Sequence, residues 1–284
     1  MRVIKTVSEM SAEAARLRGE GERIAFVPTM GNLHEGHLSL MRDARPRADV
    51  LVISIFVNPL QFEPGSDFDA YPRTFREDLK KCEPVGVDIV FAPTESDLYP
   101  EGFQTTVEVT EISKGLCGDF RPGHFKGVAT VVLKLFNIVK PHVAVFGEKD
   151  YQQLCVIRRM VKDLNLDVEI LGHPTVREAD GLAMSSRNQY LSPDERKRAA
   201  LLYKFLTEAR KRYERGERRA QALIARVQNG LARDPRISVE YVSIRDRETL
   251  APLDTVDRPA VMALAVHIGK TRLIDNIFLD QQKM

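Results

Sequence analysis

Short apolar runs alternate with helical patterns over roughly the first 175 residues, and this alternation restricts the possible fold more than any other feature. Four runs are apolar along almost their whole length, and each stops at or beside a proline or glycine: residues 24–27, 50–57, 88–91 and 143–146. Strands of this kind are typical of a parallel sheet that is covered on both faces. Helical patterns lie between the runs, over residues 36–44, 74–82 and 126–139. The alternation predicts a Rossmann-like, doubly wound α/β domain.

A different pattern begins near residue 175, after turn signals at His-Pro 173–174 and before another at Asp-Gly 180–181. Ser192 is suited to cap a long helix, because a proline follows at the first helical position and Glu195 completes a capping box. A second helix is predicted over residues 217–232, and strands over residues 239–244, 260–266 and 272–278. These elements predict a smaller α+β domain.

The length of 284 residues allows two domains of ordinary size, and we place them at residues 1–175 and 176–284. The formal net charge of +2 favours neither a nucleic-acid partner nor a membrane surface. The longest apolar run is far shorter than the ~20 residues of a membrane-spanning helix, and residues 1–10 lack the apolar block of a signal peptide. We therefore expect a cytoplasmic protein with no membrane partner.

The cysteines and the basic residues suggest no special partner. Cys82, Cys117 and Cys155 are too widely spaced for a zinc knuckle or a disulfide framework, and we interpret them as reduced thiols. Residues 194–236 carry 13 Lys and Arg against 6 Asp and Glu, a composition that also suits RNA or phosphate binding. However, apolar residues recur there at helical spacing, as in a buried stripe with a solvated outer face. We predict no nucleic-acid partner.

Ligands of such sheets bind beyond the carboxyl ends of the strands, and the segment after the first run is unusual. Residues 28–37 read PTMGNLHEGH and open the first predicted helix. Gly31 and Gly36 allow backbone to approach a ligand closely, and a helix N-terminus favours a phosphate. His34 and His37 share a face there, where their imidazoles can hydrogen-bond a departing pyrophosphate. The string HEGH is one residue shorter than the zinc motif HExxH, and we predict no metal site formed by the protein.

Three further segments carry polar groups. Asn58 and Gln61 follow the second run and can bind hydroxyl or carboxylate groups, or simply form a proline turn. Lys149 follows the fourth run and offers a point charge to phosphate. Asp150 is suited to cap the next helix, and Gln153 either completes its capping box or binds substrate. The fourth segment offers two hydroxyls and a guanidinium, which can form a phosphate clamp or simply an ordinary loop: Met184, Ser185, Ser186, Arg187 and Asn188.

Several common motifs are missing. The sequence has no GxGxxG dinucleotide fingerprint and no GxSxG nucleophile elbow. Gly269-Lys270-Thr271 resembles the end of a P-loop, but Leu264 occupies the position of the first glycine. We interpret residues 269–271 as a hairpin turn.

An early HxGH and a late MSSRN on an α/β domain resemble the HIGH and KMSKS elements of nucleotidyltransferases and class I aminoacyl-tRNA synthetases. Six longer strings together resemble bacterial pantothenate synthetases: FVPTMGNLHEGHLSL, FVNPLQF, YPRT, RPGHFKGV, FGEKDYQQL and DGLAMSSRNQYL. The resemblance continues through the string RLIDN at residues 272–276. It implies that pantoate, β-alanine and ATP are condensed to pantothenate, AMP and pyrophosphate through a pantoyl adenylate.

The resemblance also implies roles for individual residues. His37 matches the proton donor, and His34 and Lys149 are the other catalytic candidates. The positions that match ATP-contacting segments are Met30, Gly31, Asn32, Leu33, His34, Glu35, Gly36, His37, Gly147, Glu148, Lys149, Asp150, Val176, Met184, Ser185, Ser186 and Arg187. Gln61 and Gln153 match substrate-binding glutamines, and Asn58 is a weaker candidate for the same pocket. Arg121, His124 and Lys126 receive no role.

The family further implies ATP as its magnesium complex, a homodimer, and a second domain that covers the nucleotide and shields the acyl phosphate from water. Two alternatives remain. A nucleotidyltransferase would leave the nucleotide on a phosphorylated acceptor, whereas the amides of Asn58, Gln61 and Gln153 favour an uncharged or carboxylate substrate. An RNA-binding module would use the basic helices with salt-sensitive affinity, but it leaves the early motifs unexplained.

Overall fold

The computed structural model describes residues 1–63, 65 and 68–280. Its contacts divide the chain into two compact units. The first unit comprises Met1–Lys114, Gly118–Glu148 and Val156–Pro174, and the second comprises Gly115–Cys117, Lys149–Cys155 and the chain from Thr175 onward. The main division therefore lies between Pro174 and Thr175, and two short segments from earlier in the chain join the second unit.

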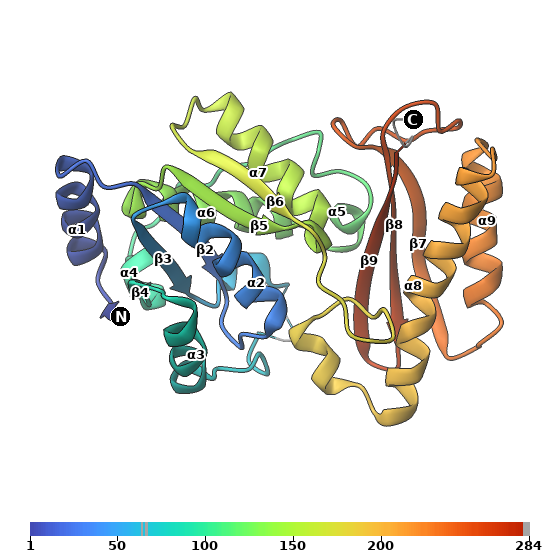
Figure 1. Ribbon diagram of the computed structural model, residues 1–284, viewed down its shortest axis with the longest axis horizontal. Helices are drawn as coiled ribbons and strands as arrows, with labels where there is room; N and C mark the ends of the chain where they lie inside the picture. Colours follow the sequence, from blue (N-terminus) through green and yellow to red (C-terminus); the bar gives the residue numbers. More distant parts are fainter. Residues whose placement is uncertain (64, 66–67, 281–284) are drawn as a thin grey trace. The chain divides into compact units, whose positions relative to one another are not determined.

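The first unit contains a six-stranded parallel sheet in the order β1-β4-β3-β2-β5-β6 (Figure 1). Its strands are β1 (Arg2–Ile4), β2 (Ile24–Thr29), β3 (Val50–Ile55), β4 (Ile89–Phe91), β5 (Val143–Gly147) and β6 (Glu169–His173). This confirms the predicted Rossmann-like fold. The four strands expected from the apolar runs are all present, whereas β1 and β6 were not predicted because neither forms a continuous apolar run.

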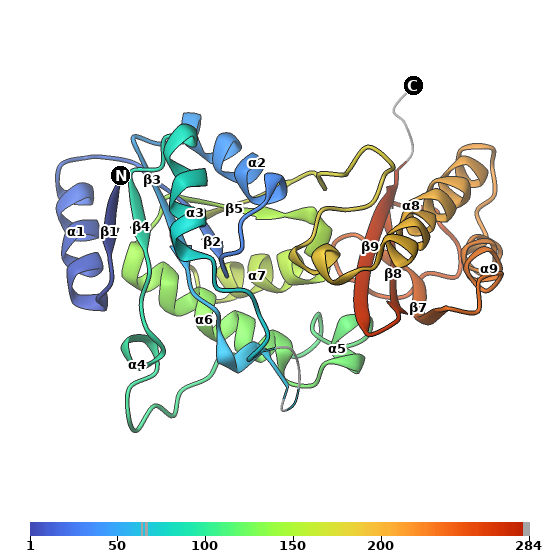
Figure 2. The same ribbon diagram turned by 90° about the horizontal axis from the view of Figure 1, so that it is seen from below.

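Helices cover both faces of this sheet (Figure 2). The helices before residue 164 are α1 (Val7–Gly19), α2 (Glu35–Ala44), α3 (Phe75–Cys82), α4 (Glu95–Leu98), α5 (Cys117–Phe120), α6 (His124–Val139) and α7 (Tyr151–Asp163). On one face, Ala25 and Val27 of β2 pack in a cluster with Met41 of α2. On the other face, the ring of Phe26 lies 6.4 Å from that of Phe136 in α6. Because side chains alternate along a strand, a continuous apolar run supplies both layers.

The predicted end of the first strand was wrong. We expected the first strand to stop at Pro28, but β2 continues to Thr29, with Pro28 paired in register with Ser54 of β3. The amide of Phe56 donates to the carbonyl of Thr29, so the neighbouring Pro28 nitrogen faces the β5 side. Pairing with β5 involves only Ala25 and Phe26. The proline therefore removes no hydrogen bond from the sheet.

The second unit contains an antiparallel sheet in the order β7-β8-β9 (Figure 1). Its elements are β7 (Ile237–Asp246), β8 (Ala260–Ile268), β9 (Thr271–Leu279), α8 (Pro193–Glu214) and α9 (Ala220–Leu231). Ser192 caps α8 in a capping box with Glu195, as predicted. Apolar residues of α8 and α9, including Leu202 and Leu223, share one buried cluster with strand residues such as Leu264. This arrangement confirms the expected α+β fold.

The predicted hairpin turn at residues 269–271 is also confirmed. Ile268 pairs with Thr271, which leaves Gly269 and Lys270 as a two-residue loop. Gly269 has a φ of 58°, a conformation that glycine adopts without strain. This register excludes a phosphate-binding P-loop at these residues, because no strand–loop–helix unit is present there.

Two further findings concern the chain as a whole. Among residues 1–63, 65 and 68–280, no helix has the length and apolar character required to cross a membrane. Cys82, Cys117 and Cys155 are free thiols, and all three are buried.

Candidate functional site

The first unit places the HEGH segment where its strand order reverses. In the order β4-β3-β2-β5-β6, the chain places β3 and β4 on one side of β2 and then places β5 and β6 on its other side. Segments that follow β2 and β5 therefore flank a topological switch point, where sheets of this class bind ligands. Residues 30–37 follow β2, and Gly147-Glu148 end β5 and continue from it.

His34 and His37 form a capping box at the start of α2. The Nδ1 atom of His34 accepts a hydrogen bond from the Gly36 amide at 3.2 Å, and Nδ1 of His37 accepts one from the His34 amide at 3.3 Å. The two ring centroids are 4.1 Å apart. An imidazole nitrogen that accepts carries no proton, so the neutral form of each ring has its proton on Nε2. Both side chains are thereby set to donate through Nε2.

A buried carboxylate holds the loop before the two histidines. Asp78 of α3 is fully buried and accepts hydrogen bonds from the amides of Asn32 and Leu33 at 2.9 and 2.8 Å. Gly31 has a φ of 80°, and a Cβ there would lie 3.1 Å from the Asp78 carboxylate. Sequence reasoning missed Asp78, although its helical spacing from Phe75 and Cys82 places it on the buried face of α3, where a carboxylate requires partners.

Asn58 and Gln61 of the first unit contact each other. Asn58 is 1% exposed, and its side-chain amide donates to Gln61 Oε1 and to the Gly127 carbonyl, both at 3.1 Å. The Tyr99 hydroxyl donates to Asn58 Oδ1 at 2.7 Å. Gln61 in turn donates to the sulfur of Met30. The structure thus brings together residues predicted to bind ATP and substrate within this unit.

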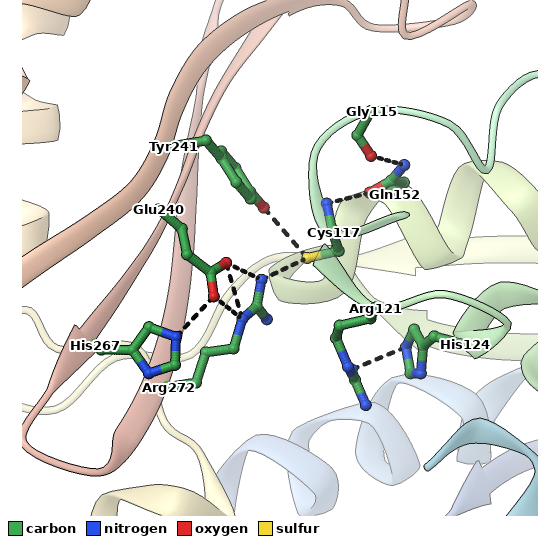
Figure 3. Close-up of polar contacts among 9 residues, drawn as sticks. All are labelled: Gly115, Cys117, Arg121, His124, Gln152, Glu240, Tyr241, His267 and Arg272. Atoms are coloured by element: carbon green, nitrogen blue, oxygen red, sulfur yellow. Dashed lines mark hydrogen bonds and ion pairs between the residues drawn. The ribbon is translucent and has the colours of Figure 1, made fainter. Parts of the chain in front are cut away.

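Arg121 and His124, which the sequence left without a role, both contact the backbone of Gln61. Nδ1 of His124 lies 2.9 Å from the Gln61 carbonyl oxygen, and Arg121 donates to the same oxygen at 3.3 Å. The two side chains also bond each other at 3.1 Å (Figure 3). Gly127 allows this close approach, since a Cβ there would lie 2.2 Å from the Leu60 carbonyl oxygen. We infer that α6 and the residues before it hold the backbone of Gln61 in place.

In the second unit, the segment around Lys149 lies at the start of α7. The Lys149 ammonium is 3.7 Å from the Asp150 carboxylate, and its side chain is only 20% exposed. Gln152 is buried and ties this segment to residues 115–117. It donates to the Gly115 carbonyl and accepts from the Cys117 amide, both at 3.0 Å (Figure 3). Gln153 follows directly on the same first turn of α7.

A network of side chains from β7, β8 and β9 reaches the same short segment. The sulfur of Cys117 lies 3.2 Å from the Tyr241 hydroxyl and 3.6 Å from the Arg272 guanidinium (Figure 3). Arg272 makes an ion pair with Glu240 at 2.7 Å, and His267 bonds the same carboxylate at 2.7 Å. Although burial opposes it, Arg272 holds the pKa of Glu240 below its ordinary value. The network anchors residues 115–117 to the sheet of the second unit.

The predicted phosphate clamp follows a tight hairpin in the second unit. The Met184 amide donates to the Val176 carbonyl at 3.0 Å, and Arg177 pairs with Ala183 in an antiparallel bridge. Ser185 then accepts a hydrogen bond from the Arg187 amide at 3.3 Å and caps the short 3₁₀ helix Ser186–Tyr190. The adenine-contacting and phosphate-clamping candidates are therefore the two ends of one hairpin.

No group of three or more His, Cys, Asp or Glu side chains suited to a metal ion occurs in the part of the chain that the structure describes. The acidic side chains near the candidate residues are already engaged by protein groups. Asp78 accepts from two amides, and Asp275 is paired with Arg177.

Comparison with known proteins gives a consistent result. The family model described as pantoate-beta-alanine ligase matches residues 2–278. A pantothenate synthetase of Syntrophobacter fumaroxidans is 55% identical over 279 residues, which cover 98% of this chain and 99% of the relative. One from Geobacter sulfurreducens is 53% identical over 283 residues and covers 100% of both chains.

Solved structures agree with the sequence comparisons. The crystal structure of pantothenate synthetase from Thermus thermophilus matches with a TM-score of 0.94 at 46% identity, covering 99% of this chain and 100% of that chain. The pantoate-beta-alanine ligase of Francisella tularensis, complexed with beta-gamma ATP and beta-alanine, matches with a TM-score of 0.80 at 35% identity. This match covers 98% of both chains.

Proposed function

We propose roles for individual residues of this chain, which belongs to the pantoate–β-alanine ligase family. It is a carbon–nitrogen ligase that condenses pantoate with β-alanine using ATP. The proposed reaction has two steps. The pantoate carboxylate first attacks the α-phosphorus of ATP and releases pyrophosphate. The amine of β-alanine then attacks the acyl carbon of pantoyl adenylate, and AMP leaves.

The paired imidazoles at the start of α2 carry this proposal. As the bond between the α- and β-phosphates breaks, negative charge grows on the pyrophosphate. Nε2–H groups of His34 and His37, together with the helix N-terminus, would stabilise that charge by hydrogen bonding. His37, which matches the family's proton donor, would donate its Nε2–H hydrogen bond to the leaving pyrophosphate. The capping box supports this role because it fixes both rings and both tautomers before ATP binds. The surrounding loop, Met30–Gly36, would contact the nucleotide through its backbone.

Residues of the second unit would bind the same nucleotide. Lys149, beside Asp150, would contact phosphate oxygens, and the Val176 backbone would contact adenine. Met184 and the hydroxyls and guanidinium of Ser185, Ser186 and Arg187 would hold the phosphates. The hairpin that links Val176 to Met184 supports this assignment, because it fixes both ends in one rigid piece. We further propose that the part of this unit from residue 176 onward shields the adenylate from water, while residues 1–175, including Lys149, bind ATP and pantoate.

Glutamines would bind the small substrates. Gln61 and Gln153 would orient pantoate, and Gln61 would also contribute to the β-alanine site. Asn58 is almost fully buried, so we propose that it acts chiefly by holding Gln61. The carboxamide of Gln61 would then present a defined donor and acceptor to the substrate.

Magnesium would enter as part of the ATP substrate. The phosphate oxygens of ATP would supply most of the protein-bound ion's ligands other than water, as is usual for magnesium at nucleotide sites. We also propose a homodimer in the cytoplasm. The three free thiols suit a reducing compartment, and light scattering during size-exclusion chromatography would give the oligomeric state.

The first experiment is pantoate-dependent exchange of labelled pyrophosphate into ATP without β-alanine. We expect exchange, because adenylate formation is reversible on the enzyme. AMP release that occurs only with β-alanine, without exchange, would contradict a freely reversible adenylate. If a folded sample shows no pantoate-dependent reaction in either assay, the proposed function fails. A product that retains the nucleotide, detected by mass spectrometry, would identify a nucleotidyltransferase instead.

A further inference from the structure

The string RLIDN places two polar residues in the buried middle of β9. Asp275 is 2% exposed and Asn276 is 6% exposed, and apolar residues flank them on the same strand. A buried charge or amide is costly unless other groups satisfy it. The partners of these two side chains are therefore informative about what the strand holds in place.

Asp275 binds the hairpin that carries the adenine-contacting candidate. Its carboxylate receives two hydrogen bonds from Arg177, at 2.7 and 2.9 Å. Arg177 also donates to the Gly181 carbonyl at 3.0 Å, and its guanidinium stacks on the ring of Tyr203 at 3.8 Å. Since Arg177 directly follows Val176, the ion pair fixes one end of the hairpin against the sheet.

Asn276 binds the segment that carries the phosphate-contacting lysine. Its side-chain amide donates to the Lys149 carbonyl at 2.9 Å. Its own carbonyl accepts from Arg177 at 3.1 Å. Two adjacent residues of one strand thus hold two segments that are 28 residues apart in the sequence, residues 149 and 177, within the same unit.

Electrostatics links these groups as well. Burial raises the pKa of Asp275, while the hydrogen bonds and charge of Arg177 and the charge of Lys149 act in the opposite direction. The carboxylate therefore interacts with both cations across an interior that screens charge weakly. Removing its charge would alter the surroundings of both nucleotide-binding segments.

We propose that Asp275 and Asn276 are positioning residues for the nucleotide, which set the spacing between Lys149 and the hairpin from Val176 to Met184. This inference depends on the proposed function, because it assumes that both segments contact ATP. The covalent links of one nucleotide limit the distance between its phosphates and its adenine. A rigid strand that holds both segments therefore keeps the site in its binding geometry before ATP arrives.

The test uses the full-length protein with the substitutions Asp275→Asn and Asn276→Leu, which keep the approximate side-chain shapes. Asp234→Asn is the matched control, because Asp234 forms a comparable pair with the buried Arg198 at 2.7 Å in the same unit. We would measure KM for ATP, pantoate and β-alanine, thermal unfolding, and AMP binding by calorimetry without turnover. The last measurement reports positioning without any catalytic step.

We expect KM for ATP and Kd for AMP to rise about tenfold or more in both variants, because small displacements of binding groups have large effects. KM for β-alanine should stay within about twofold, and the control should lose stability without a change in nucleotide affinity. Folded variants with unchanged AMP affinity would overturn the proposal. So would an equal rise of all three KM values that follows the loss of thermal stability, as in the control.

A second variant covers the case in which Asp275→Asn fails to fold. Arg177→Lys keeps a cation beside Asp275 but removes the forked hydrogen bonds, and the same selective loss of nucleotide affinity is expected. The wild type separates the two hypotheses. If it binds AMP but shows no pantoate-dependent reaction, the proposed function fails. If it is active while the variants retain nucleotide affinity, only the positioning role fails.

Discussion

At the scale of single residues, one pair of side chains serves both structure and chemistry. His34 and His37 satisfy backbone amides at the start of α2 through Nδ1, which leaves the proton of each neutral ring on Nε2. A helix cap normally uses a short side chain such as serine or aspartate. Imidazoles can replace them here because they accept at one nitrogen and donate at the other.

Substitution of His37 should separate these two tasks. We expect His37→Gln to lower the rate of pyrophosphate exchange by about 10²–10³-fold, the usual effect of removing a donor to developing charge. The loss of stability should be only about 1 kcal/mol, as for a lost cap. Ser192→Ala is the control, since it removes the capping box of α8. Equal activity losses in the two variants would argue against a chemical role for His37.

At the scale of elements, close contacts between helices and loops determine where the polar groups lie. The start of α6 packs directly against the short 3₁₀ helix Pro59–Gln61 through Gly127. In the second unit, the hairpin after Val176 is attached to α8 by Arg196, which binds Asp180 at 2.5 Å. Each contact supports a segment that carries candidate site residues.

Replacement of Gly127 should disturb the segment that carries Gln61. The added methyl of Gly127→Ala would lie 2.2 Å from the Leu60 carbonyl oxygen, so the two elements must separate. We expect a loss of about 1–3 kcal/mol in urea unfolding and a higher KM for pantoate. Gly19→Ala is the control because no atom lies within 4 Å of the added methyl. An unchanged KM in the Gly127 variant would show that Gln61 tolerates this displacement.

The attachment of the hairpin to α8 predicts a dependence of stability on pH. Hydrogen bonds from Arg196 hold the pKa of Asp180 below its ordinary value. This stabilisation is therefore complete above the pKa of the Asp180 carboxyl in the unfolded chain, about 3.9, and is lost as the pH falls through the lower folded value. Between about pH 6 and pH 3, the midpoint temperature of thermal unfolding should fall less steeply in Asp180→Asn than in the wild type. Parallel profiles would show that the ion pair is too solvated to matter.

At the scale of the whole molecule, each unit has its own buried core, and the three thiols are distributed between the units. Cys82 lies in the first unit, and Cys117 and Cys155 lie in the second. All three are buried and free.

Thiol titration tests whether the three cysteines are buried and reduced. Burial raises the pKa of Cys82 to about 12, so the reactive thiolate is scarce at about pH 8. We expect the native protein to react slowly with an aromatic disulfide reagent, and all three thiols to react at once in denaturant. Fewer than three thiols after unfolding without reductant would reveal an oxidised pair. Rapid reaction of Cys82 in the native protein would show that α3 opens locally.

Much of the fold was predictable because it is encoded locally. The run at residues 24–27 predicts a doubly covered strand, Ser192 and Glu195 predict the start of α8, and Gly269 predicts the hairpin turn. Strands β1 and β6 were not predicted. β1 is only three residues long and is a strand because it pairs with β4, and that pairing joins residues more than 80 positions apart.

The sequence alone determined the family and the residue types of the candidate site, because its motifs are continuous strings whose chemistry is evident from neighbouring residues. Only the tertiary structure decided which groups hold those motifs. Asp78 binds the loop before His34, Arg121 and His124 bind the Gln61 carbonyl, and Asp275 binds Arg177. These partners are distant in the sequence, and a local pattern describes one side of such a contact but not the other. A buried polar group is satisfied only by whatever the completed fold brings to it.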